Sequence, residues 1–179
     1  MNLPNKITVF RVVMIPFFLV FMLAGGIPYG KYIAAAIFIV AALSDLLDGY
    51  LARKNNLVTN FGKFMDPIAD KLLVSSALIC FVELKLLPAW IVIIIIAREF
   101  IISAFRLIAS DNGVVIAASW WAKVKTTVQM IMSIMLIINL DDPIINVLEQ
   151  VVIYLAVVLT LVSLVEYLIK NKNVLNEKK

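Results

Sequence analysis

Four aspartates lie close together in a sequence that is otherwise strongly apolar. Asp45 and Asp48 are three residues apart, and Asp66 and Asp70 are four residues apart. Either spacing places a pair on one face of an α-helix, so two neighbouring helices would gather four carboxylates at one site. Four like charges repel one another unless a cation lies among them, and oxygen ligands without histidine or thiolate suit Mg²⁺, Mn²⁺ or Ca²⁺. The sequence therefore predicts a site for hard divalent cations.

Two small residues and an arginine follow the first aspartate pair. Gly49 and Ala52 leave one side of the predicted helix without bulky side chains. A glycine inside a helix costs about 1 kcal/mol relative to alanine, and the close approach of a ligand would explain its presence. Arg53 adds a planar donor suited to phosphate. Taken singly, each of these residues fits a solvated cap or a helix-packing face equally well. Taken together, they indicate a metal site that handles phosphate groups.

The same stretch forms a longer motif with fixed spacing. It reads D-x2-D-G-x2-A-R-x8-G-x3-D-x3-D, and its fixed positions are Asp45, Asp48, Gly49, Ala52, Arg53, Gly62, Asp66 and Asp70. This motif resembles the signature of the CDP-alcohol phosphatidyltransferase family, and the hydropathy around it agrees over nearly the whole chain. Members of that family move a phosphatidyl or related group from a CDP-linked donor to an alcohol and release CMP.

The resemblance implies a role for each matching residue. Asp45, Asp48 and Asp66 would hold a pair of Mg²⁺ or Mn²⁺ ions, and Asp70 would serve as both metal ligand and general base. The residues implied in CDP-diacylglycerol binding are motif residues, a nearby lysine and two polar residues at the start of the first span: Asn5, Thr8, Gly49, Ala52, Arg53, Gly62 and Lys63. Lys63 has an alternative role as a snorkelling interfacial lysine. Family members also resemble one another in forming homodimers.

The composition is that of a membrane protein. Hydrophobic residues make up 63% of the 179 residues, and the mean hydropathy is +1.02, far above that of a soluble domain. We expect one all-α domain over residues 1–179 with six transmembrane helices. Their expected ranges are 5–24, 32–53, 63–84, 88–109, 115–139 and 143–169. Asp142 before Pro143 has the pattern of a helix N-cap with proline at the first helical position, although we favour a solvated loop carboxylate.

The charged residues occupy alternate ends of successive spans. Because successive spans run in opposite directions, these charges meet on one side of the membrane. Of the 16 lysines and arginines, all but Lys31 and Lys85 fall on that side. The positive-inside rule then makes this side cytoplasmic, with both ends of the chain there, in a bacterial cytoplasmic membrane. Charges at matching depth in several helices predict a polar cavity open to the cytoplasm. The basic balance indicates anionic lipids and phosphates as partners, with no sign of nucleic acid.

A second set of basic residues is a candidate binding site for the acceptor, the alcohol that receives the phosphatidyl group. The segments IAREFIISAFR and AKVKTTVQ resemble those of bacterial family members that use glycerol 3-phosphate, and they contain the candidate phosphate ligands Arg98, Arg106, Lys123 and Lys125. Glu99 offers another explanation, since it would neutralise one of the arginines.

Two alternative functions stay open. One is the same reaction with inositol phosphate, serine or phosphatidylglycerol as acceptor. The other is cation transport through the carboxylates, which the apolar far halves of the spans disfavour, because a transporter would need broken helices or charges near the bilayer centre.

Overall fold

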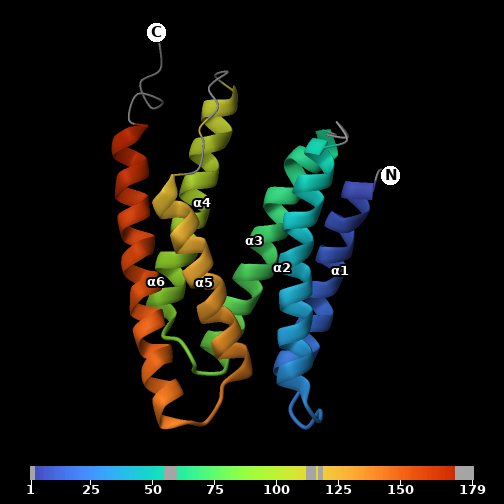
Figure 1. Cartoon of the computed structure of the whole chain (residues 1–179), viewed down its shortest axis with the longest axis vertical. Helices are drawn as coiled ribbons and strands as arrows, with labels where there is room; N and C mark the ends of the chain where they lie inside the picture. Colours follow the sequence, from blue (N-terminus) through green and yellow to red (C-terminus); the bar gives the residue numbers. More distant parts are fainter. Residues whose placement is uncertain (1–2, 55–59, 112–115, 117–118, 172–179) are drawn as a thin grey trace. The chain divides into compact units, whose positions relative to one another are not determined.

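The computed structural model describes residues 3–54, 60–111, 116 and 119–171; within the helices, it leaves out the side chains of residues 3–4, 45–54, 60–64, 66–67 and 111. The described residues form α-helices and contain no strand (Figure 1). The helices are α1 (Leu3–Leu23), α2 (Gly30–Lys54), α3 (Asn60–Glu83), α4 (Ala89–Asp111), α5 (Trp120–Ile138) and α6 (Pro143–Lys170). The predicted all-α class is confirmed.

Most helices begin and end within about three residues of the predicted bounds, which is close to the usual uncertainty of helix ends. Helix α5 differs, because it begins at Trp120 and not at residue 115. The Ser119 hydroxyl oxygen accepts a hydrogen bond from the Ala122 amide at 3.2 Å, so Ser119 caps the helix. Asp142 is exposed, as expected of a solvated carboxylate, and it also caps α6: its carboxylate accepts hydrogen bonds from the amides of Ile144 and Ile145 at 2.9 and 3.2 Å.

The chain divides into two compact units. The first contains Met1–Leu87 and Ile134–Asn139, and the second contains Pro88–Ser133 and Leu140–Lys179. Each unit is a helical assembly with its own buried residues, so each is described by itself.

In the first unit, α1 packs against both α2 and α3. Phe18 and Phe38 are fully buried between α1 and α2, with ring centroids 6.0 Å apart. The start of α2 lies close to the end of α1: a Cβ added at Gly30 would lie 3.0 Å from the carbonyl oxygen of Phe21. Small residues at such contacts let two backbones come together, which is the usual packing of helices in membranes.

The polar segments of the first unit share one end. Helix α1 begins at the end where α2 finishes and α3 starts, as the ribbon shows (Figure 1). The backbone therefore brings both halves of the aspartate motif and the polar start of α1 to the same end of this unit.

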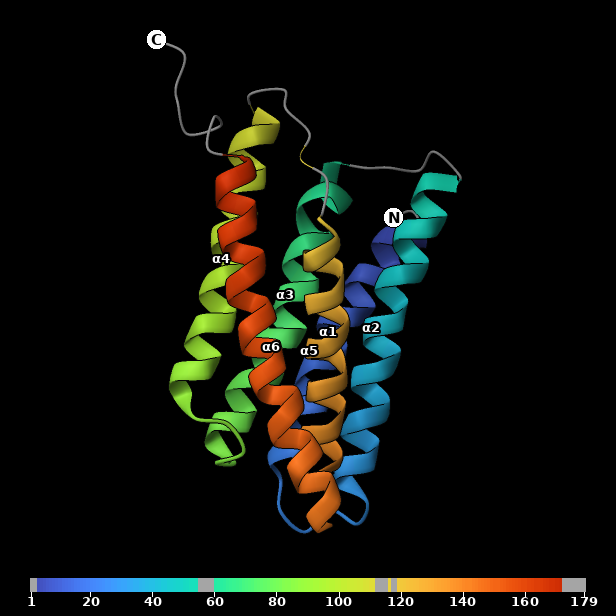
Figure 2. The ribbon, with the colours of Figure 1, turned by 60° about the vertical axis from the view of Figure 1, so that its left-hand side comes forward.

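In the second unit, α6 runs alongside α4 in both ribbon views (Figures 1 and 2). Phe105 of α4 meets Tyr167 of α6 edge to face, with ring centroids 6.1 Å apart, and Ile102 completes this buried cluster. The last turns of α4 and α6 and the first turns of α5 lie at the same end of the unit (Figure 2).

Three of the described helical segments are long and apolar enough to cross a membrane: Asn5–Leu23, Trp120–Ile138 and Pro143–Lys170. Helix α4 is equally apolar for much of its length, but it carries Arg98, Glu99 and Arg106. Large apolar side chains cover the outside of α6, as expected for contact with lipid. The chain is thus a helical membrane protein, whereas six transmembrane spans and a cavity facing the cytoplasm stay predictions.

Candidate active site

The aspartate motif is helical, as its spacing predicted. Asp45 and Asp48 lie in the last part of α2, and Asp66 and Asp70 lie in the first part of α3. The side chains of Asp45, Asp48 and Asp66 are outside the described residues. Asp70 is described and is partly buried. Among the described residues no group of three or more acidic, cysteine or histidine side chains could hold a metal, so the predicted four-carboxylate site is neither confirmed nor contradicted.

The donor set itself fits a hard divalent cation. Both pairs lie on helices, with i, i+3 spacing in α2 and i, i+4 spacing in α3, so each pair occupies one helix face. The donors are carboxylate oxygens only, which suits Mg²⁺ or Mn²⁺ better than zinc or copper.

The predicted donor-binding residues of α2 and α3 also belong to these helices. Their side chains fall outside the described residues, and their roles stay predictions: Gly49, Ala52, Arg53, Gly62 and Lys63.

Three polar residues at the start of α1, Asn5, Thr8 and Arg11, follow one another at intervals of three and are buried within the first unit. Asn5 is 8% exposed, and Thr8 and Arg11 have no exposed surface. A guanidinium with no access to water is costly unless anions or other polar groups compensate it. Sequence reasoning gave Arg11 no role in the site, although its spacing from Asn5 and Thr8 was a signal. Its burial at the end of the unit that holds the aspartate motif makes it a further candidate site residue.

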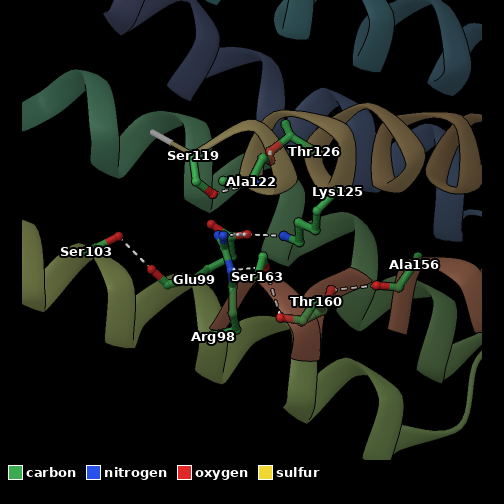
Figure 3. A network of polar contacts seen from close by, with 10 residues as sticks. All are labelled: Arg98, Glu99, Ser103, Ser119, Ala122, Lys125, Thr126, Ala156, Thr160 and Ser163. Carbon is green, nitrogen blue, oxygen red and sulfur yellow. Dashed lines mark hydrogen bonds and ion pairs between the residues drawn. The ribbon is translucent and has the colours of Figure 1, made fainter. Parts of the chain in front are cut away.

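A cluster of opposite charges lies in the second unit (Figure 3). Arg98 Nη1 is 3.3 Å from Glu99 Oε1, and Lys125 Nζ makes an ion pair with the same oxygen. Arg98 and Lys125 are 5% and 1% exposed, whereas the side chain of Glu99 is 24% exposed. The alternative explanation, in which Glu99 neutralises an arginine, thus holds for Arg98, and the same carboxylate also contacts Lys125.

Helix α6 holds the arginine of this cluster from the other side. Arg98 Nε donates a hydrogen bond to Ser163 Oγ at 3.2 Å, and Ser163 Oγ donates to the Thr160 carbonyl oxygen at 3.0 Å. The Thr160 hydroxyl in turn donates to the Ala156 carbonyl oxygen at 2.7 Å. Arg98 Nη2 is buried and has no hydrogen-bond partner among the described residues. The Nε and Nη1 groups of Arg98 therefore have partners, and its Nη2 group is left to donate to an anion.

Burial separates the four predicted acceptor residues into two pairs. Arg98 and Lys125 are buried and share Glu99, while Arg106 and Lys123 are exposed. Ser163 was missed from the sequence, although it stands three residues after Thr160 in a helix that is otherwise nearly all apolar. Such paired hydroxyl residues in an apolar helix were the available signal.

Comparison with known proteins places these features in one family. Residues 1–162 match the family model described as CDP-alcohol phosphatidyltransferase. The chain is 46% identical over 183 aligned positions to the CDP-diacylglycerol–glycerol-3-phosphate 3-phosphatidyltransferase of Bacillus subtilis, covering 95% of each chain. It is 42% identical to the Haemophilus influenzae protein of the same name, covering 93% of this chain and 91% of that one. It is also 40% identical to a probable phosphatidylglycerophosphate synthase of Mycobacterium tuberculosis, covering 93% and 79% respectively.

Proposed function

This chain belongs to the CDP-alcohol phosphatidyltransferase family, and from that premise we propose that it transfers the phosphatidyl group of CDP-diacylglycerol to glycerol 3-phosphate. The products are phosphatidylglycerophosphate and CMP. Two of the relatives named above, those of Bacillus subtilis and Haemophilus influenzae, carry glycerol 3-phosphate in their names and cover nearly the whole of this chain, which supports this acceptor.

The structural observation that supports glycerol 3-phosphate as the acceptor is the burial of two cations in one cluster. Arg98 and Lys125 lie within the membrane protein almost without exposure, and burying a cation there is expensive unless an anion compensates it. Glu99 supplies one negative charge to two positive ones. A phosphate group suits two such cations, because arginine offers a planar fork and lysine a point charge. A neutral alcohol would gain nothing from this arrangement.

The reaction joins the acceptor oxygen to the phosphorus of the phosphatidyl group and breaks the bond from that phosphorus to CMP. Asp70, partly buried at the polar end of the first unit, would take the proton from the attacking hydroxyl. Arg53 and Lys63 would bind the donor diphosphate, and Gly49 and Ala52 would leave room for the nucleotide. Family members generally need a divalent metal. Mg²⁺ or Mn²⁺ held by Asp45, Asp48, Asp66 and Asp70 would supply charge stabilisation for phosphoryl transfer.

The reaction would occur at a bacterial cytoplasmic membrane, with the site facing the cytoplasm. The lipid donor enters from the bilayer and glycerol 3-phosphate from water, so a polar cavity at the charged ends of the helices suits both substrates. A homodimer is proposed on the family resemblance alone.

An acceptor screen tests this function. Purified protein with CDP-diacylglycerol in mixed micelles and Mg²⁺ or Mn²⁺ is given glycerol 3-phosphate, inositol phosphate, serine or phosphatidylglycerol, and CMP release is measured. We expect CMP with glycerol 3-phosphate and phosphatidylglycerophosphate as the lipid product. CMP release with another acceptor alone would assign the chain to a different branch of the family. Ion flux in proteoliposomes without CMP release would instead favour the transporter.

A further inference from the structure

The carboxylate of Glu99 occupies the place that an acceptor phosphate would need. One of its oxygens contacts both Arg98 Nη1 and Lys125 Nζ (Figure 3). These are the two buried cations proposed to bind the phosphate of glycerol 3-phosphate. A phosphate oxygen and the Glu99 oxygen cannot lie between the same two donors, and two anions at this distance would repel each other.

The three charged side chains differ in how deeply they are buried. Arg98 is buried and held on α6 through its hydrogen bond to Ser163, and Lys125 is the more deeply buried of the two cations. Glu99 has the greatest exposed fraction of the three, so its carboxylate has the readiest access to water. The cations are therefore the most buried part of this cluster, and the carboxylate is the part with the most access to water.

We propose that Glu99 is an internal counter-ion that fills the acceptor phosphate position in the empty enzyme and is displaced when glycerol 3-phosphate binds. This inference rests on the proposed function. It makes Glu99 a specificity-determining residue: only an anion that binds Arg98 and Lys125 better than a carboxylate does can open the position.

A phosphate has the means to displace this carboxylate. Its additional oxygens can reach Arg98 Nη2, the buried donor that has no partner among the described residues. Its second negative charge strengthens every hydrogen bond from the two cations. A neutral alcohol brings no charge to the exchange, and an acceptor with a single carboxylate has no advantage over Glu99. Such discrimination works by holding back the wrong acceptors as much as by attracting the right one.

The need to displace Glu99 also weakens the binding of glycerol 3-phosphate itself. When the binding-competent arrangement is populated only in part, the apparent dissociation constant rises by the inverse of that fraction. If Glu99 is displaced in about a tenth of the empty molecules, removing its charge lowers the Michaelis constant for glycerol 3-phosphate about tenfold.

The test is Glu99→Gln in the full-length protein, with Glu166→Gln as matched control. Glu166 pairs with Lys170 at a partly exposed position of α6, so its neutralisation changes the net charge by the same amount. We expect Glu99→Gln to lower KM for glycerol 3-phosphate about tenfold, to leave KM for CDP-diacylglycerol unchanged, and to lower the inhibition constant of inorganic phosphate by a similar factor. The control should match the parent in all three. An unchanged or higher KM for glycerol 3-phosphate in Glu99→Gln would overturn the inference.

A second measurement covers loss of stability, because Glu99→Gln leaves two buried cations with a neutral partner. The thermal midpoint of the purified protein is recorded with and without inorganic phosphate. We expect a lower midpoint without phosphate and a larger rise on adding it than in the parent; an equal or smaller rise counts against displacement.

If Glu99→Gln does not accumulate, Glu99→Asp keeps the charge with a shorter reach and should lower KM by a smaller factor. A parent that releases no CMP with glycerol 3-phosphate would overturn the proposed function itself, whereas an active parent with unresponsive variants would overturn only the role of Glu99.

Discussion

At the scale of single residues, burial distinguishes cations that looked equivalent in the sequence. We expect Arg98→Ala and Lys125→Ala each to raise KM for glycerol 3-phosphate by about ten- to a hundredfold, the usual effect of losing a hydrogen bond to a charged group. KM for CDP-diacylglycerol should change little. Arg106→Ala is the control, since Arg106 is exposed on the same helix, and its effect should be smaller. Initial rates of CMP release with each substrate varied in turn provide the measurement. Loss of donor binding in the two buried variants would contradict the phosphate assignment.

The carboxylates of the motif carry a different expectation. Asp45→Asn, Asp48→Asn and Asp66→Asn should each abolish activity, because losing one anionic ligand weakens the whole metal site. Asp70→Asn should reduce turnover more than substrate binding, as expected for a general base. Steady-state kinetics across a range of Mg²⁺ and Mn²⁺ concentrations separates these cases. Full activity of the parent in excess chelator would refute the metal requirement.

At the scale of the helices, α6 positions a residue of α4. Ser163→Ala removes the acceptor of Arg98 Nε, a buried hydrogen bond worth about 1 kcal/mol. We expect KM for glycerol 3-phosphate to rise about fivefold, with turnover and donor KM nearly unchanged. Thr127→Val is the matched control, because the Thr127 hydroxyl makes a hydrogen bond within its own helix at an exposed position, donating to the Lys123 carbonyl oxygen at 3.2 Å. Equal effects of the two variants would argue against a positioning role for Ser163.

The helices were predictable from the sequence because apolar runs of membrane length alternate with short polar breaks, and most bounds followed from that pattern. The start of α5 did not follow, since apolar residues such as Val115 and Ile116 precede Trp120, whereas one hydrogen bond to Ser119 decides where the helix begins. The contact of Arg98 with Ser163 joins residues 65 positions apart. It depends on the rotation of α4 against α6, which hydropathy does not encode.

At the scale of the whole molecule, the expected topology puts all lysines and arginines except Lys31 and Lys85 on the cytoplasmic side. Tyr29, whose side chain is 77% exposed between α1 and α2, should then face the outside, and position 175 should face the cytoplasm. In a Cys80→Ser background, Tyr29→Cys should react with a membrane-impermeant thiol reagent in intact cells. Leu175→Cys should react only after the cells are permeabilised. Reaction of Leu175→Cys in intact cells would reverse or refute the topology.

The tight contact at Gly30 has a mechanical consequence for this architecture. Gly30 and Asp45 lie on one continuous helix, about 22 Å apart at 1.5 Å per residue. A Cβ at position 30 would lie 3.0 Å from the carbonyl oxygen of Phe21 in α1, so a larger residue there requires α1 or α2 to shift. If α2 tilts to relieve that contact, the far end of the helix, which carries the motif, is displaced as well. A contact between two backbones at one end of α2 thus helps to set where the backbone of the motif lies at the other end.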